Sequence, residues 1–318
     1  MTWHILVPDN VNRRATDLLA AIPDFRVTAP GNMPRNEVLA EIGSAHALII
    51  RSATTVDAEL LAAAPKLRAI ARAGAGVDNV DLEATLARGI IVVNTPGGNT
   101  ISTAEYTLAL MLALARHIPQ GHASLAAGNW DRAAFGGVEL QGLTLGIIGM
   151  GRIGRDVAAR ASAFDMVCIG YDPYVDARSA HTAGIEKQDS LEQVFARADF
   201  LTLHALVTPE TRHMINATSL ELMKPGIRII NAARGALIDE AALAAALQSG
   251  QVAGAAVDVY PEEPPPADYP LLNLPNVIHT PHLAASTDGA QVRVAIEAAE
   301  LLRDGLLRDD WRNVVSSD

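Results

Sequence analysis

The sequence predicts an α/β protein with two parallel-sheet units in tandem. Short apolar runs alternate with stretches rich in alanine and leucine along most of the 318 residues, a pattern typical of parallel strands joined by helices. The alternation stops near residue 100, where a longer segment has apolar residues at helical spacing, and it begins again at Leu143. A chain of this length is long enough for two domains.

The first unit begins with the N-terminal alternating series. Its expected strands lie at residues 4–8, 25–29, 47–52, 67–73 and 89–95. Helices are expected between them at residues 11–22 and 57–64. The pattern therefore predicts a parallel sheet with helices packed on it.

A longer helix is predicted at residues 100–118, ending near Pro119. Residues 121–142 contain several glycines and predict an irregular arm. Because Trp130 and Phe135 in this arm have no evident place in either α/β core, we expect the arm to cross to a second subunit.

The second alternating series predicts strands at residues 143–149, 166–172, 200–205, 226–232, 252–259 and 276–282. Helices are expected at residues 190–198 and 239–250, the latter with Asp239 as N-cap and Gly250 as its C-terminal stop. A last long helix, at residues 286–307, is followed by no further strand series. We therefore expect it to pack back on the first unit.

The composition excludes several classes of partner. A formal charge of -11 argues against nucleic-acid and anionic-membrane partners, because both would repel the protein. No apolar stretch approaches the roughly 18 residues of a membrane span, and the N-terminus has no signal-peptide pattern. The single cysteine, Cys168, is expected to be a buried core thiol, and it leaves no pair for a disulfide or a cysteine metal site. We expect a cytoplasmic protein without a metal.

The segment GIIGMGRIGRD places three glycines between a predicted strand and a predicted helix. Gly149 would permit a tight bend, Gly151 would let a pyrophosphate approach the backbone, and Gly154 would let the helix pack closely on the strand. The pyrophosphate would lie on N–H groups near Arg152 and Ile153, at the positive end of the helix. The pattern predicts a dinucleotide-binding turn, and the alternative is an ordinary βα turn.

Asp172 ends the next predicted strand. It lies 18 positions after Gly154, close to the spacing of about 20 in dinucleotide-binding folds. Its carboxylate would accept hydrogen bonds from ribose hydroxyls and would repel a 2′-phosphate. Pro173 and Tyr174 follow, where an NADP enzyme often has arginine. NAD is therefore favoured as the cofactor.

Five further motifs follow a fixed order around this turn: RAGAGVDNVDLEA, NTPGGNTISTAE, NAARGALIDEAAL, GAAVDVYPEEPP and TPHLAAST. Over essentially the whole chain they closely resemble the D-isomer-specific 2-hydroxyacid dehydrogenases. The resemblance implies two Rossmann-like, doubly wound parallel-sheet domains with a cleft between them. Residues 1–99 and 286–318 would form a discontinuous substrate-binding domain, and residues 100–285 an NAD-binding domain. It also implies a homodimer that acts on a small 2-hydroxy or 2-oxo acid.

Within this family the motifs are most similar to the enzymes that oxidise 3-phosphoglycerate in serine biosynthesis. The expected form is a short one without the C-terminal regulatory domain, so we expect hyperbolic kinetics and no inhibition by serine. One alternative is a hydroxypyruvate or glyoxylate reductase, or another D-2-hydroxyacid dehydrogenase, with the same catalytic set. A binding protein that senses NAD, similar to a corepressor, is the alternative from another class.

The resemblance places three catalytic residues: Arg234 in NAARG, Glu263 before the proline of PEEP, and His282 in TPHL. His282 would exchange a proton with the C2 oxygen while a hydride moves at C2. Glu263 would orient the imidazole and favour its protonated form, and Glu262 is the rival for this role. Arg234 would bind the substrate carboxylate with its two-pronged guanidinium.

The resemblance also implies contacts to the cofactor and the substrate. Asp258 would meet the nicotinamide carboxamide, and the other residues on the nicotinamide side would be Ala205, Ala232, Ala233, Arg234, His282, Ala284 and Ala285. Substrate contacts are expected from Arg51, Ser52, Arg72, Gly76, Val77, Asn99 and, across a subunit interface, Arg132. The three arginines favour a dianionic substrate tail.

The sequence departs from the family pattern at a few positions. Ala75 and Ala205 stand where relatives often have threonine, and Leu206 stands where proline is usual. Ala284 and Ala285 replace common glycines, which predicts a stiffer loop on the nicotinamide side. None of these changes removes a proton-transfer group.

Overall fold

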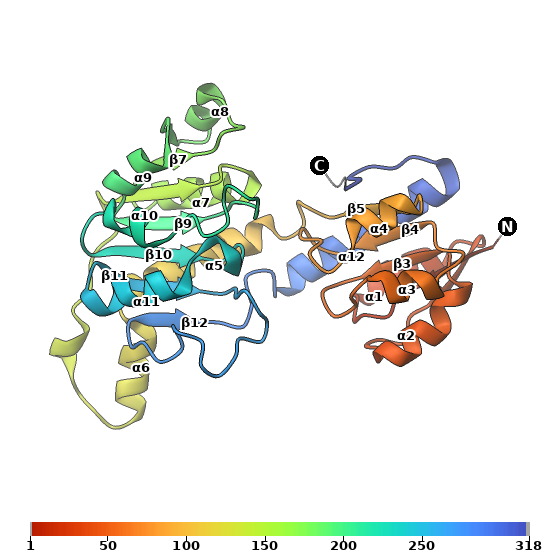
Figure 1. The fold of residues 1–318 in the computed structure, drawn as a ribbon, viewed down its shortest axis with the longest axis horizontal. Helices are drawn as coiled ribbons and strands as arrows, with labels where there is room; N and C mark the ends of the chain where they lie inside the picture. Colours follow the sequence, from red (N-terminus) through yellow and green to blue (C-terminus); the bar gives the residue numbers. More distant parts are fainter. Residues whose placement is uncertain (1, 316–318) are drawn as a thin grey trace. The chain divides into compact units, whose positions relative to one another are not determined.

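The computed structural model describes residues 2–315, which form two compact units (Figure 1). Unit 1 combines the N-terminal part of the chain up to Thr100 with the C-terminal part from Ser286. Unit 2 is Ile101–Ala285. Each unit is built on its own parallel sheet, as the alternating pattern predicts.

Unit 1 has a five-stranded parallel sheet with the order β2-β1-β3-β4-β5. The strands are β1 Trp3–Leu6, β2 Phe25–Thr28, β3 Ala47–Ile50, β4 Ala69–Arg72 and β5 Ile91–Asn94. The helices are α1 Arg13–Ala20, α2 Arg35–Glu41, the 3₁₀ turn η1 Ile42–Ser44, α3 Ala58–Ala63, α4 Leu82–Ala87 and α12 Asp288–Arg308. Each strand overlaps a predicted run, whereas α2 and α4 were not predicted.

Alternate residues of the unit 1 sheet face two different apolar layers. In β3, Ile49 packs in the layer that contains α1 and α12, whereas Leu48 and Ile50 pack in the layer that contains α2 and α3. Helix α12 thus completes the core formed by the beginning of the chain, as expected. Burial of both faces is the reason that these strands form continuous apolar runs in the sequence.

Unit 2 has a seven-stranded parallel sheet with the order β12-β11-β10-β9-β6-β7-β8. The strands are β6 Thr144–Ile148, β7 Val167–Tyr171, β8 Glu186–Lys187, β9 Phe200–Leu203, β10 Ile227–Asn231, β11 Val252–Val257 and β12 Val277–His279. The helices are α5 Thr100–Ala115, α6 Ile118–Ala126, η2 Arg132–Phe135, α7 Arg152–Ser162, α8 Ala177–Thr182, α9 Leu191–Arg197, α10 Ala217–Glu221, η3 Gly235–Leu237 and α11 Glu240–Ser249.

The six strands predicted for unit 2 are confirmed, and the short elements β8, α8 and α10 were missed. Asp239 caps α11 by accepting a hydrogen bond from the N–H of Ala242, and Gly250 ends the helix in the left-handed conformation. The chain order reverses between β6 and β9, which makes the carboxyl ends of these strands a topological switch point. Nucleotide cofactors bind at such points in open parallel sheets.

The arm after α5 differs from the prediction. Helix α5 ends at Ala115, and a second helix, α6, begins at Ile118 after His117 adopts a left-handed backbone. Pro119 lies in the first turn of α6. N–H groups in the first turn of a helix have no acceptor within the helix, so the missing N–H of proline costs nothing there. Pro119 therefore stands at the start of α6 and does not end α5. The predicted irregular arm is therefore helical up to Ala126, and Figure 1 shows α6 projecting below the sheet of unit 2.

Candidate active site

The glycine turn lies between β6 and α7 and has the geometry that a pyrophosphate requires. Gly149 has a φ of +91°, and a Cβ on Gly154 would lie 2.2 Å from the carbonyl oxygen of Gly149. A Cβ on Gly151 would meet no atom within 4 Å, so the space in front of this residue is open. No side chain caps the first turn of α7, which leaves its N–H groups for an anion. These residues fit a dinucleotide.

Asp172 follows β7 beside this turn. Its Oδ2 accepts a hydrogen bond of 2.9 Å from the N–H of Met150, and its Oδ1 accepts one of 2.9 Å from the N–H of Tyr174. Each carboxylate oxygen has a second lone pair. Asp172 can therefore hold the turn and still accept from ribose hydroxyls.

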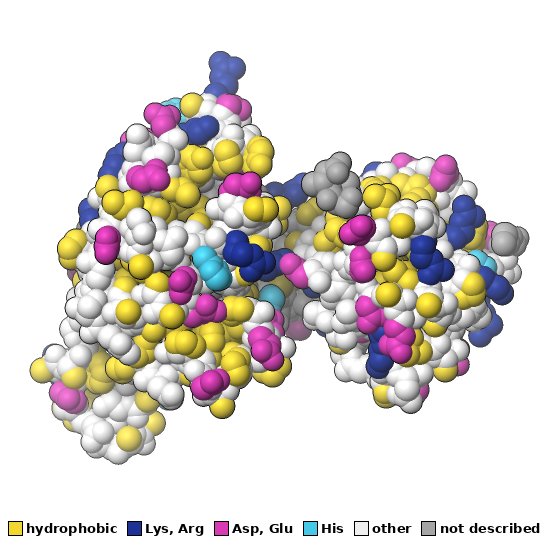
Figure 2. Space-filling view, viewed as in Figure 1, with side chains coloured by type: hydrophobic (Ala, Val, Ile, Leu, Met, Phe, Trp, Pro, Cys, Tyr) yellow, Lys and Arg dark blue, Asp and Glu magenta, His cyan; other side chains and the backbone are white. Residues whose placement is uncertain are grey.

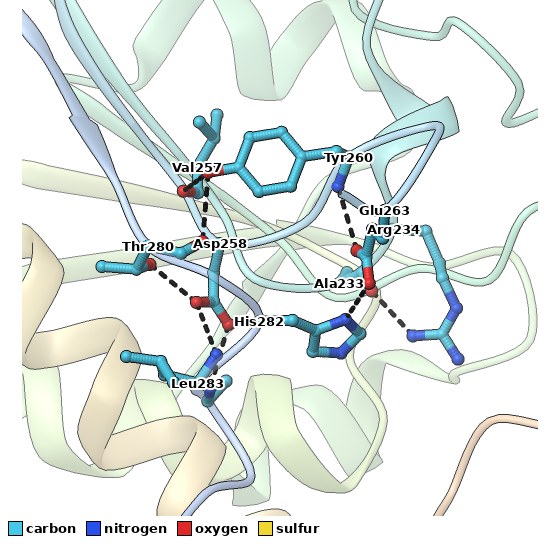
Figure 3. A network of polar contacts seen from close by, with 10 residues as sticks. Ala233, Arg234, Val257, Asp258, Tyr260, Glu263, Thr280, His282 and Leu283 are labelled. Atoms are coloured by element: carbon cyan, nitrogen blue, oxygen red, sulfur yellow. Dashed lines mark hydrogen bonds and ion pairs between the residues drawn. The ribbon is translucent and has the colours of Figure 1, made fainter. Parts of the chain in front are cut away.

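Three loops at the carboxyl edge of the unit 2 sheet carry the predicted catalytic residues. Arg234 follows β10, Glu263 lies in the loop after β11, and His282 follows β12. Figure 3 shows the three side chains together, and Figure 2 shows histidine, basic and acidic side chains adjoining on one exposed part of unit 2. Parallel strands bring these loops together because their carboxyl ends share one edge.

His282 and Glu263 form a pair. The Nδ1 atom of His282 lies 2.8 Å from Oε2 of Glu263, and both side chains are partly exposed. The second carboxylate oxygen of Glu263 accepts a hydrogen bond from the N–H of Tyr260. Glu263, rather than its rival Glu262, is thus the carboxylate in contact with the imidazole. The pairing leaves Nε2 as the ring nitrogen for a substrate.

Arg234 depends on two neighbours that sequence analysis missed. Asn231, at the end of β10, donates to the carbonyl of Arg234 and accepts from the N–H of Ala233. A Cβ on Gly235 would lie 2.1 Å from the backbone of Tyr260, so only glycine lets this turn approach the loop after β11. The Arg234 guanidinium donates to the carbonyl of Ala233 at 2.7 Å and is half-buried.

Asp258, directly after β11, is bonded to the loop that carries His282. Its side chain is fully buried, with 0% exposure. The carboxylate accepts hydrogen bonds from the Thr280 hydroxyl at 2.6 Å, from the N–H of Leu283 at 2.8 Å and from the N–H of Ala284 at 2.9 Å. Asp258 therefore holds the loop of His282 in place, and its contact with a nicotinamide carboxamide stays a prediction.

The backbone at His282 is left-handed, with a φ of +54°. Residues other than glycine adopt this conformation rarely, and it is concentrated at functional sites. The carbonyl of Asp258 accepts the N–H of His282 at 2.8 Å, and the Tyr260 hydroxyl donates to the carbonyl of Thr280 at 3.1 Å. Burial raises the pKa of Tyr260, so its hydroxyl keeps the proton that it donates.

A hollow of about 400 Å³ adjoins the His282–Glu263 pair. It is lined by Tyr260, Glu263, Pro264, Pro265, His279, Thr280, Pro281 and His282.

Other predicted cofactor residues lie along the same edge of the unit 2 sheet. They are Ala205 after β9, Ala232 and Ala233 after β10, and Ala284 and Ala285 after β12. His204, which sequence analysis did not single out, directly follows β9, and its Nε2 lies 3.0 Å from the hydroxyl oxygen of Thr202. Burial lowers the pKa of His204 to about 4, so the imidazole is neutral at pH 7.

The predicted substrate residues, apart from Arg132, lie in unit 1. Arg51 and Ser52 follow β3, Arg72 ends β4 and precedes the loop with Gly76 and Val77, and Asn99 follows β5. All belong to the carboxyl edge of the five-stranded sheet. Arg132 lies in η2 of the arm and is exposed.

The Arg51 guanidinium donates to the carbonyl of Asn10 at 3.1 Å. The Arg72 guanidinium folds over Gly74, and its Nη1 atom lies 3.4 Å from the carbonyl oxygen of Ala73. Both guanidinium groups therefore contact backbone carbonyl groups near the carboxyl ends of the strands.

Between residues 2 and 315, no group of three or more histidine, cysteine, aspartate or glutamate side chains is arranged to hold a metal ion. Across the same residues, none of the helices has both the length and the apolar character needed to cross a bilayer.

Comparison with known proteins identifies the class. Residues 108–284 match the family model of the D-isomer specific 2-hydroxyacid dehydrogenase, NAD binding domain. The chain therefore belongs to this family, and unit 2 contains its NAD-binding domain.

Individual relatives agree with this assignment. The chain is 47% identical over 312 residues to D-3-phosphoglycerate dehydrogenase of Methanocaldococcus jannaschii, covering 98% of this chain and 59% of the relative. A crystal structure of a glyoxylate reductase from Paecilomyes thermophila is 30% identical, with a TM-score of 0.88 and coverage of 99% of this chain and 98% of that one.

A D-lactate dehydrogenase from Aquifex aeolicus, complexed with NAD and lactic acid, is 28% identical, with a TM-score of 0.81 and 99% coverage of both chains. The chain spans 51–59% of the length of the curated D-3-phosphoglycerate dehydrogenases that it matches.

Proposed function

We propose that the chain catalyses the NAD-dependent oxidation of a D-2-hydroxy acid, with 3-phosphoglycerate as the substrate and 3-phosphohydroxypyruvate, an intermediate of serine biosynthesis, as the product. The observation that carries this proposal is the His282–Glu263 pair of 2.8 Å with Arg234 beside it. The set supplies a base, a carboxylate that orients it and a cation for the acid group. The identity to D-3-phosphoglycerate dehydrogenases supports the choice of substrate.

The three residues have different tasks in this reaction. His282 accepts the proton of the C2 hydroxyl. When bound in the glycine turn, NAD would be the acceptor of the hydride that leaves C2. In the reverse direction His282 returns the proton to the C2 oxygen. Glu263 holds Nδ1 so that Nε2 performs the transfer. Arg234 binds the carboxylate next to C2 and polarises the C2 oxygen.

The cofactor is assigned to the open glycine turn of unit 2. Gly151 leaves room for the pyrophosphate, and the uncapped first turn of α7 provides N–H donors for it. Asp172 would accept from the adenosine ribose, which favours NAD over NADP. In unit 1, Arg51 and Arg72 are cations for a phosphate tail.

A glyoxylate or hydroxypyruvate reductase is the second candidate, favoured by the similarity to the glyoxylate reductase structure. Both candidates use the same proton-transfer set and differ in the substrate tail. A steady-state assay with 3-phosphoglycerate, D-glycerate, D-lactate, hydroxypyruvate and glyoxylate separates them. We expect the highest kcat/KM with 3-phosphoglycerate. A higher kcat/KM with glyoxylate would favour the second candidate, and NAD binding without turnover of any acid would indicate a sensor protein.

Two adjacent glutamates provide the matched test of the site. Glu263→Gln removes the charge that faces His282, and we expect kcat to fall by about tenfold or more. Glu262→Gln makes the same chemical change one residue earlier and should leave kcat within about twofold of wild type, since surface changes are usually small. Equal effects of the two substitutions would remove Glu263 from the mechanism.

We propose that the chain forms a homodimer through helix α6 and the arm. None of the residues Ile118–Ala126 is buried, although Ile118 and Leu125 are apolar, and Trp130 is 80% exposed. Such exposed apolar side chains mark an interface, and a second copy of the chain would cover them and bring Arg132 to the partner's active site. Light scattering at micromolar concentration should give a dimer, and Leu125→Lys should weaken it. A monomeric wild type would contradict this.

The protein is also proposed to work in the cytoplasm, in line with the use of NAD as a soluble cofactor. Cell fractionation followed by immunodetection tests this location. Recovery of the protein in an extracytoplasmic fraction would contradict it.

A further inference from the structure

Asp9 is a buried carboxylate in unit 1 that the proposed reaction does not use. It follows β1 and is 4% exposed. One carboxylate oxygen accepts hydrogen bonds from the N–H of Arg51 at 2.5 Å and from the N–H of Thr54 at 3.3 Å, and the other accepts from the Thr54 hydroxyl at 2.5 Å. Asp9 therefore holds both ends of the segment 51–54, which we call the RSAT loop.

Asn79 holds the same loop by its carbonyl groups. Its amide nitrogen donates to the carbonyl of Arg51 at 2.7 Å and to that of Thr54 at 2.6 Å. At both ends of the RSAT loop, the N–H is thus taken by Asp9 and the C=O by Asn79. The neighbour of Asp9, Asn10, accepts the Arg51 guanidinium at 3.1 Å, so backbone and side chain of this arginine depend on one short segment.

Packing contributes little to the position of the centre of the loop. Ser52 and Ala53 at its centre are exposed. A hollow of about 360 Å³, lined by Met33, Arg35, Val38, Ala53, Thr54, Thr55 and Asp57, lies against it. With solvent at the centre and a hollow alongside, the hydrogen bonds to Asp9 and Asn79 are the main restraint.

A buried carboxylate is costly unless its charge is met by donors, and a satisfied buried network defines one geometry. Asp9 has three donors, all from the RSAT loop, within the part of the chain that the structure describes. Its charge is therefore compensated only when the loop is in place. An apolar residue at this position would offer no acceptor and would specify no position for Arg51.

We propose that Asp9 is a positioning residue that fixes the RSAT loop, so that Arg51 and Ser52 meet the anionic tail of the substrate in one preformed geometry. This inference rests on the proposed function, because it assigns the loop to the substrate tail. Its effect is on recognition of the tail and not on proton transfer, which belongs to His282 in unit 2.

Three variants test this role. Asp9→Ala removes all three hydrogen bonds. Asp9→Asn keeps them in part, because its amide oxygen accepts both N–H groups and its amide nitrogen donates to the Thr54 hydroxyl. Asp304→Ala is the matched control, since Asp304 is also a buried carboxylate of unit 1, 6% exposed, whose partners are Arg303 and Arg312.

Steady-state kinetics give the first measurement. Asp9→Ala should raise the KM for 3-phosphoglycerate by about tenfold or more, because misplaced binding groups weaken recognition strongly. It should leave kcat within about threefold of wild type and the KM for NAD unchanged, since neither depends on the loop. The KM for glyoxylate, which has no tail, should also be unchanged. Asp9→Asn should restore most of the loss, and Asp304→Ala should show none of it.

Hydrogen exchange gives the second measurement, which does not depend on turnover. Exchange of the amides of Arg51 and Thr54 should be at least about tenfold faster in Asp9→Ala than in wild type, and unchanged in Asp304→Ala. Slow exchange in Asp9→Ala would overturn the role of Asp9 whatever the substrate is. Fast exchange with an unchanged ratio of the KM values for 3-phosphoglycerate and glyoxylate would overturn the link to the tail. A wild type that prefers another acid with a tail contradicts the proposed function, and the KM comparison is then made with that acid against glyoxylate. A preference for glyoxylate itself would overturn the link to the tail as well, and hydrogen exchange would still test the role of Asp9.

Discussion

In each unit, a buried aspartate holds one loop at the carboxyl edge of the sheet. In unit 1, Asp9 accepts two N–H groups and one threonine hydroxyl from a single loop, and in unit 2, Asp258 does the same. Both carboxylates are buried and follow a strand directly or within a few residues. The loops that they hold differ. Asp258 holds a loop with a left-handed histidine, whereas Asp9 holds one with an arginine.

The difference shows what each unit must define. Proton transfer requires His282 in hydrogen-bond reach of both Glu263 and the substrate, so unit 2 holds its loop in an uncommon backbone conformation and adds Tyr260 as a second support. Recognition of an anionic tail requires only that a cation is well placed. We infer that the chemistry belongs to unit 2 and the choice of substrate to unit 1. The Asp9 variants test the part of unit 1, and the substitutions below test the part of unit 2.

The largest effect is expected at His282. His282→Ala should lower kcat by about a hundredfold or more, the usual contribution of a general acid–base group, and leave NAD binding nearly intact. The matched control is His213→Ala, because His213 is an exposed histidine of unit 2 with a φ of +51°. Its kcat should equal that of wild type. Steady-state kinetics with a fluorescence titration of NADH measure both, and near-normal turnover of His282→Ala would place the chemistry elsewhere.

Two substitutions in the glycine turn distinguish the stability of unit 2 from its binding of the cofactor. Gly151→Ala adds a methyl group in open space, so the free energy of unfolding should not change while the Kd for NAD rises by about thirtyfold. Gly154→Ala puts a Cβ at 2.2 Å from a backbone oxygen and should destabilise the fold by about 1–3 kcal/mol. Urea unfolding and NAD titration distinguish the two. Unchanged NAD affinity in Gly151→Ala would contradict the assigned pyrophosphate position.

Replacement of Asp172 tests the preference for NAD over NADP. Asp172→Ser removes ribose acceptors and a charge that repels a 2′-phosphate, so the Kd for NAD should rise by about tenfold and the Kd for NADP should rise much less. Asp172→Asn is the control for the turn, since its amide oxygen still accepts from Met150. Calorimetric titration of both cofactors is the measurement. A wild type that prefers NADP would show that Asp172 has another role.

The smallest effect concerns the stability of unit 2 in acid. Because the folded pKa of His204, about 4, lies below the ordinary value of 6.5, the unfolded chain binds a proton that the folded chain excludes as the pH falls below 6.5. Stability is therefore lost as the pH falls toward 4. Relative to His204→Gln, wild type should lose about 1 kcal/mol between pH 7 and pH 5.5.

Urea unfolding at the two pH values measures this loss. Replacement of the exposed His122 by Gln serves as the control and should produce no such difference. An equal pH dependence of wild type and His204→Gln would show that His204 takes up its proton in the folded protein.

Much of the fold was predictable because its information is local. Strands buried on both faces appear as apolar runs, such as ALII in β3, whatever they pack against. The glycine turn and the Asp239 cap likewise depend on neighbours within a few residues. The short elements β8, α8 and α10 lack such runs and were missed. Helix α6 was mistaken for an irregular arm because Pro119 has opposite meanings at the start and at the end of a helix.

The candidate catalytic residues were predicted only through the resemblance to a family, since no spacing in the sequence relates Arg234, Glu263 and His282. The choice between Glu262 and Glu263 also needed the structure, because the direction of a side chain in a loop depends on the backbone that surrounds it.

By itself, the sequence determined the two parallel-sheet units and the dinucleotide turn, because apolar periodicity and glycine spacing act over short distances. Only the tertiary structure decided which polar groups meet. Asp9 and Arg51 are 42 positions apart, and Asp258 and Ala284 are 26 apart, yet each pair shares a hydrogen bond. Such contacts arise because parallel strands bring distant loops to one edge of a sheet, and no local pattern of residues records which loops become neighbours.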